Sequence, residues 1–143
     1  MMFLSNWLSG FGKIGRLDIT SRYLSGENVY LGQNSPINDA LRRGGAAVVR
    51  LYYEVEHYVL LTGEQDGNLL MFDPYYWKEP YEQKDILMTE DHPFSYNRIV
   101  PEYYFNREST EIYSLGPKKG REAVLLFNGR TKLTDEKTIE YFI

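Results

Sequence analysis

Three apolar segments follow one another closely in the middle of the chain, at residues 46–53, 57–63 and 69–73. They are rich in valine, leucine and tyrosine, whose branched and aromatic side chains pack well on a pleated strand. The last two are joined by Gln65-Asp66-Gly67, which is typical of a hairpin loop with glycine in the left-handed region. We therefore expect an antiparallel meander of three strands, and the rest of the fold must pack around it.

Two helices are predicted before this meander. Residues 2–11 place their apolar side chains at helical spacing, and a series of glycines then ends the pattern. Ser35 and Pro36 supply an N-cap and a proline at the first helical position, so a second helix is expected over residues 36–43. Both helices thus lie early in the chain.

Further strands are predicted on both sides of the meander. Residues 74–93 are rich in aromatics and prolines without a sustained period, and we expect a long surface excursion there. The remaining expected strands are residues 19–24, 29–31, 97–100, 123–127 and 138–142. Together these elements predict an α+β fold with a mostly antiparallel sheet, in a single domain of residues 1–143.

The composition excludes several classes of function. The net charge of -4 and the pI near 5.2 argue against nucleic acid, because binding to phosphates requires clustered basic residues. No apolar run reaches the length of a membrane helix and no secretory signal opens the chain, so we expect a cytoplasmic protein. The chain has no cysteine and only two histidines, so thiolate metal sites and thiol nucleophiles are absent from it. We expect no metal and no cofactor.

One candidate catalytic pair comes from the predicted hairpin. A three-residue loop would pair Glu64 with Asn68, and the same register would place Val59 opposite Asp73. His57 then lies on the same sheet face as Asp73, one diagonal step away. A carboxylate beside an imidazole fixes the tautomer of the ring and stabilises its protonated form. His57 and Asp73 therefore suggest the base and orienting residue of a nucleophilic triad, although this spacing alone is more often structural.

The other candidates are weaker. Asp91 and His92 lie before a proline in a polar loop, where a histidine is most simply solvated. Glu54 and Glu56 beside His57 could suggest a metal site, but no second histidine lies near. Residues 118–121 are interpreted as a solvated turn. The 13 tyrosines favour packing at the ends of the sheet, with a peptide-binding groove as the alternative.

The centre of the chain resembles a known family. The matching segments are DALRRGGAAVV at residues 39–49, HYVLLTG at 57–63 and DGNLLMFDPY at 66–75. In this order they are similar to the C-terminal half of the bacterial bacteriocin-processing, double-glycine-leader peptidase-like family of papain-like cysteine peptidases. The resemblance covers residues 35–77 well and the rest poorly. It implies that His57 is a general base oriented by Asp73, and that the substrate is a peptide or amide.

The sequence departs from this family at the nucleophile. The family has a cysteine at the start of an N-terminal helix and a glutamine just before it, whereas this chain has no cysteine. We therefore expect a papain-like half-fold that is truncated at its N-terminus and inactive as given. Ser5 and Ser9 of the first helix are poor substitutes, because a hydroxyl needs more activation than a thiol. The alternative function is a noncatalytic peptide-binding or interaction module.

A missing catalytic helix has a consequence for association. The sheet face that carries the histidine should then be left uncovered, with Val59, Leu61 and Met71 among the exposed residues. Such an apolar surface favours a homo-oligomer, or pairing with the missing N-terminal segment. A symmetric dimer in which the first helix or an edge strand fills the vacancy is the simplest arrangement.

Overall fold

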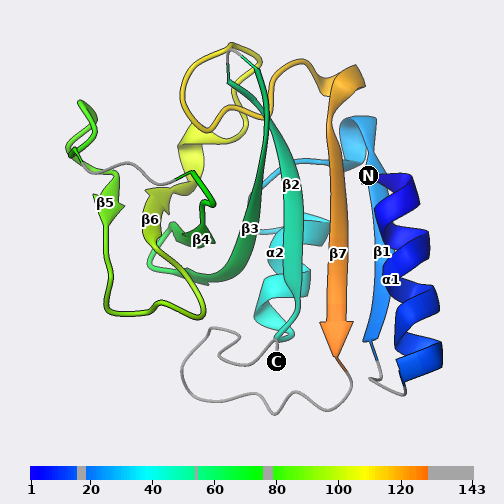
Figure 1. The fold of residues 1–143 in the computed structure, drawn as a ribbon. Coiled ribbons are helices and arrows are strands. Elements are labelled where there is room, and N and C mark those ends of the chain that lie inside the picture. Colours follow the sequence, from blue (N-terminus) through cyan, green and yellow to red (C-terminus); the bar gives the residue numbers. More distant parts are fainter. Residues whose placement is uncertain (16–18, 54, 76–78, 129–143) are drawn as a thin grey trace.

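The computed structural model describes residues 1–15, 19–53, 55–75 and 79–128, which form a seven-stranded sheet with helices on both faces (Figure 1). The spatial order is β1-β7-β2-β3-β4-β6-β5, and every described strand pair is antiparallel. This confirms the predicted α+β class. The strands are β1 (Ile19–Ser25), β2 (Ala46–Tyr53), β3 (Val55–Gln65), β4 (Asn68–Phe72), β5 (Leu87–Met88), β6 (Arg98–Pro101) and β7 (Glu122–Asn128).

The two predicted helices are confirmed as α1 (Met2–Gly15) and α2 (Pro36–Arg42). The N-terminus of α2 has the expected cap, since Asn38 donates its backbone N–H to Ser35 Oγ at 2.9 Å. Three short 3₁₀ helices complete the described elements: η1 (Gly26–Asn28), η2 (Glu102–Tyr104) and η3 (Lys118–Gly120). In Figure 1, α1 runs along the β1 edge of the sheet and α2 lies behind β2 and β3.

The meander β2-β3-β4 is confirmed, but its second loop differs from the prediction. The loop has two residues, Asp66 and Gly67, both with positive φ (51° and 79°), so Gln65 pairs with Asn68. Near the turn the expected register is therefore wrong by one residue. A bulge between Leu61 and Gly63 absorbs the difference, and Leu60 pairs with Phe72. Beyond the bulge the strands return to the predicted register.

The main core lies on the sheet face that carries Val49, Val59 and Leu61, which we call the inner face. Helix α2 covers this face with Ile37, Ala40 and Leu41. A second cover comes from the loop segment 104–115, and its core residues are Tyr104, Phe105, Tyr113 and Leu115. Elements of the chain itself thus cover the core residues of the inner face.

The prediction of an uncovered inner face is therefore wrong. Val59, Leu61 and Met71 are 2%, 0% and 0% exposed. The reason is that segment 104–115, whose tyrosines were expected at sheet ends or in a groove, folds back over the sheet and buries its apolar side chains.

The opposite face, which we call the outer face, is covered only in part. Met1 and Leu8 at α1 pack against Ala46, Val124 and Leu126 of β2 and β7. Further across the same face, Tyr58 of β3 and Phe72 of β4 remain 41% and 37% exposed. Partly exposed apolar side chains thus lie on the face away from His57, where the sequence did not predict them.

Further expectations need correction. Val29–Leu31, within the described part of the chain, is not a strand, because side chains replace a strand ladder. Asn106 bonds both the N–H and the carbonyl of Leu31, and Arg121 donates to the carbonyl of Val29. The turn at 118–121 is exposed to solvent up to residue 120, whereas Arg121 is buried, with 2% of it exposed. Residues 74–93 contain the short strand β5, and the strand expected at 138–142 lies outside the described residues.

Candidate functional site

The site centres on His57 and Asp73, which meet on the inner face of the sheet. His57 lies near the start of β3, and Asp73 directly follows β4. The restored register beyond the bulge places both side chains on one face, and His57 Nε2 lies 2.8 Å from Asp73 Oδ1. The contact predicted from the sequence is therefore present. The His57 side chain is 23% exposed and that of Asp73 is 5% exposed.

The Asp73 carboxylate is held by two more donors. Its Oδ1 accepts the backbone N–H of Tyr75 at 2.8 Å, and its Oδ2 accepts the hydroxyl of Tyr113 at 3.2 Å. Asn97 fixes the backbone of Asp73, because its side-chain amide bonds both the N–H and the carbonyl of Asp73 at 2.8 Å. Asp73 therefore has a defined orientation toward the imidazole.

This pairing distinguishes the two ring nitrogens of His57. A carboxylate only accepts hydrogen bonds, so the neutral ring carries its proton on Nε2. Nδ1 then has its lone pair available, and it has no hydrogen-bond partner among the described residues. Chemically, this arrangement is a base whose tautomer is fixed by a buried carboxylate.

His57 and Asp73 lie in the wall of an open cleft of about 1010 Å³. Opposite walls come from residues 79–83 and from the segment 104–115. Val55 and Tyr75 stand at the cleft and are 73% and 62% exposed. The cleft therefore offers apolar and aromatic surface beside the imidazole.

Three residues at this site were not identified from the sequence: Tyr81, Arg98 and Tyr113. Burial, followed by the hydrogen bond with Tyr81, raises the pKa of Tyr113 above its ordinary value, so the hydroxyl stays protonated and can donate to Asp73. Tyr113 lies 40 residues from Asp73 along the chain. The abundance of tyrosine was the sole signal, and it did not indicate which tyrosine reaches the carboxylate.

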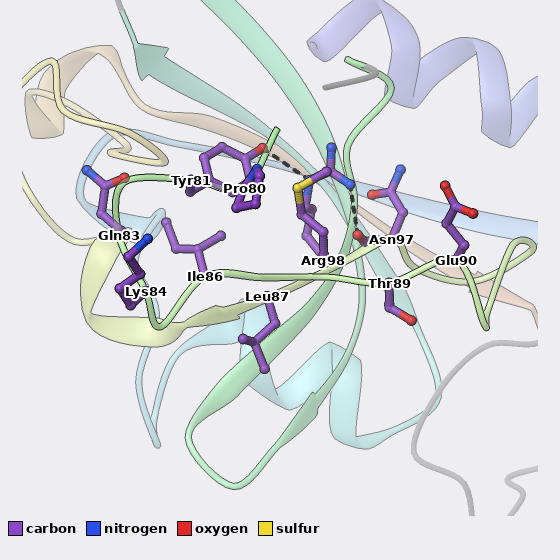
Figure 2. Close-up of a pocket in the computed structure, with 11 residues that line it drawn as sticks. Pro80, Tyr81, Gln83, Lys84, Ile86, Leu87, Thr89, Glu90, Asn97 and Arg98 are labelled. Atoms are coloured by element: carbon purple, nitrogen blue, oxygen red, sulfur yellow. Dashed lines mark hydrogen bonds between the residues drawn. The ribbon is translucent and has the colours of Figure 1, made fainter. Parts of the chain in front are cut away.

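A second cavity of about 490 Å³ adjoins the cleft through Tyr81, which lines both (Figure 2). Figure 2 shows Arg98 in the wall of this cavity, with hydrogen bonds to the hydroxyl of Tyr81 and to the backbone carbonyl of Asn97. Lys84 and Glu90 also line it. Arg98 thus stands between this cavity and the site.

The weaker candidates lie apart from this arrangement. His92 is exposed and its ring stacks on Tyr96 at 4.4 Å. Glu56 pairs with Arg50 at 3.1 Å, and Glu54 lies outside the described residues. Within the ranges the structure describes, no three His, Asp or Glu side chains are placed to hold a metal ion. Ser5 and Ser9 both bond Ser21 at the α1–β1 contact on the outer face, away from the imidazole.

Comparisons with models of protein families, with curated proteins and with solved structures give no match. Among the helices of the described ranges, none is long and apolar enough to cross a membrane.

Proposed function

We propose that this chain supplies the base and orienting residue of a cysteine peptidase-like site that acts on peptide or amide bonds. The observation that carries the proposal is the 2.8 Å bond between His57 Nε2 and the buried Asp73, which leaves Nδ1 available at an open cleft. The papain-like half-fold and the cytoplasmic location inferred from the sequence are part of this proposal.

In the proposed reaction, His57 Nδ1 takes the proton of a thiol, and Asp73 stabilises the imidazolium that forms. The thiolate attacks the carbonyl carbon of the substrate, and the imidazolium returns its proton to the leaving amine. Water then hydrolyses the thioester and regenerates the thiol. The thiol must come from outside these residues, because the 143 residues include no cysteine.

The test begins with the coding DNA upstream of Met1. The proposal expects an in-frame, helix-forming segment with a glutamine and a cysteine. In the extended protein, His57→Ala should slow alkylation of that cysteine by iodoacetamide at neutral pH and reduce cleavage of a fluorogenic peptide about 100-fold or more, because the thiol loses its base. His92→Ala is the matched control, since it removes the other imidazole of the chain and should leave both rates unchanged.

A second candidate function is a noncatalytic peptide-binding module. The absence of cysteine favours it, as does the exposed aromatic surface of Tyr75 at the cleft. A stop codon and a ribosome-binding site directly before Met1 would support this module and would contradict the peptidase proposal. An upstream cysteine whose reactivity does not depend on His57 would also contradict the peptidase proposal.

A further inference from the structure

We propose that Tyr113 and Tyr81, anchored by Arg98, are positioning residues that hold the Asp73 carboxylate against His57. The inference rests on the proposed function, because it assigns roles at the same site. A continuous series of hydrogen bonds links the four side chains. Arg98 Nε lies 3.1 Å from the Tyr81 hydroxyl, which lies 2.6 Å from the Tyr113 hydroxyl, and this lies 3.2 Å from Asp73 Oδ2.

The donors in this series can point in one direction only. A guanidinium has no acceptor, so Arg98 donates to the oxygen of Tyr81. The carboxylate of Asp73 accepts, so Tyr113 must use its proton there. Tyr81 therefore donates to Tyr113. Each hydroxyl accepts one bond and donates one, and the series runs from a buried cation to a buried anion.

Because these groups are buried, each of them depends on its hydrogen-bond partners within the protein. Arg98, Tyr113 and Asp73 are each 3–4% exposed, so the loss of a hydrogen-bond partner would leave a buried polar group unsatisfied. On Asp73, the Oδ1 oxygen bonds His57 and the backbone N–H of Tyr75, whereas Tyr113 is the partner of Oδ2. Without Tyr113, Oδ2 would lose this donor, and the carboxylate could rotate away from the imidazole.

Arg98 also fixes the backbone around Asp73. Its two terminal nitrogens donate to the carbonyls of Asn97, at 2.8 Å, and Tyr75, at 3.3 Å. Asn97 in turn holds the backbone of Asp73 through its side-chain amide. A single guanidinium thus supports Asp73 through the tyrosines, through Tyr75 and through Asn97.

A merely structural role for the tyrosines would leave the state of the His57 ring unchanged, so the ring is the readout. The 143-residue chain is labelled with ¹⁵N, and the nitrogen shifts of its two imidazoles are recorded at alkaline pH. In the native chain we expect widely separated His57 nitrogen shifts, with Nε2 protonated, and a low-field Nε2–H proton signal. His92 is the internal reference.

Tyr113→Phe should bring the two His57 nitrogen shifts closer together and remove the low-field proton, because the ring then exchanges between tautomers. Tyr81→Phe and Arg98→Lys should do the same, and Tyr81→Phe should add nothing in a Tyr113→Phe background. Tyr104→Phe is the matched control, since this buried tyrosine donates instead to Asp85 at 2.7 Å. It should leave the His57 signals unchanged.

Native His57 signals in both Tyr113→Phe and Tyr81→Phe, each folded by circular dichroism, would overturn the inference. Asp73→Asn separates this failure from a failure of the proposed function. If Asp73→Asn changes the His57 signals while the tyrosine variants do not, the His57–Asp73 pair exists and the tyrosines do not position it. If Asp73→Asn also has no effect, both proposals fail.

Discussion

At the scale of single residues, the site depends on how Tyr113 is buried. Tyr113 is 3% exposed and bonds Tyr81 and Asp73, and its ring packs against Phe105. Burial, together with these neighbours, raises its pKa above the ordinary value. In the unfolded chain the same hydroxyl ionises near pH 10. The folded protein therefore retains a proton that the unfolded chain loses.

This difference predicts a loss of stability at alkaline pH. Above about pH 10 the unfolded state binds fewer protons than the folded state, so the free energy of unfolding falls as pH rises. Tyr113→Phe should make this fall shallower by about 1.4 kcal/mol per pH unit, which corresponds to one proton. Urea unfolding between pH 8 and 11.5 measures the slope. Tyr30→Phe, which removes an exposed hydroxyl, is the control, and equal slopes in native and Tyr113→Phe proteins would contradict the prediction.

At the scale of elements, the position of α2 over the sheet depends on a close approach at Gly45. A Cβ atom at this position would lie 2.8 Å from the carbonyl oxygen of Leu126 in β7 and 2.9 Å from that of Ala40 in α2. Both neighbours are backbone atoms that cannot rotate aside. Glycine at residue 45 therefore lets the chain pass from α2 into β2 while the helix stays against the inner face.

Gly45→Ala should destabilise the fold by about 1–3 kcal/mol, because helix and sheet must separate to admit the methyl group. Gly10→Ala is the matched substitution in α1, where an added Cβ meets no atom within 4 Å. It should stabilise the protein by about 0.5–1 kcal/mol through its higher helix propensity. Chemical denaturation measures both changes. A neutral Gly45→Ala variant would show that α2 is less tightly packed than the structure indicates.

At the scale of the whole molecule, the two sheet faces differ in how they are covered. The core residues of the inner face are covered by α2 and by segment 104–115, and the same face carries His57 and Asp73. The outer face is covered by α1 at β1 and β7, and Tyr58 and Phe72 remain partly exposed beyond it. On α1 itself, Phe3 is 80% exposed. The self-association expected from the sequence was assigned to the inner face, which is covered, so an association would instead use the exposed apolar residues of the outer face and α1.

We predict a reversible dimer at micromolar concentration that dissociates on dilution, because large apolar side chains, among them Phe3, Tyr58 and Phe72, remain exposed. Light scattering over a dilution series measures its mass. Phe3→Asp should shift the protein to monomer without harming α1, since an acidic residue is favourable in the first helical turn. Phe94→Asp replaces a similarly exposed phenylalanine, in a loop, and should behave as the native chain. If the unsubstituted chain is a monomer at every concentration in the series, the prediction of a dimer is contradicted.

Local sequence patterns were sufficient for the elements that depend on neighbouring residues. The cap at Ser35-Pro36 predicted α2, and the valine, leucine and tyrosine content together with the Gln65-Asp66-Gly67 loop predicted the meander. The register of that hairpin brought His57 to Asp73. Those features follow from helix and strand periods, which are properties of short segments. The predicted loop length was wrong, yet the bulge before Gly63 compensated for it.

Tertiary structure alone decided what covers the inner face and what holds Asp73. Tyr113, Tyr81 and Arg98 reach the site from segments whose own patterns say nothing about it, and Tyr113 is 40 residues away. The sequence determined the pair of catalytic candidates because two adjacent strands of one hairpin carry them. It could not determine their supports, because a contact between distant segments depends on how the whole chain packs rather than on any local period.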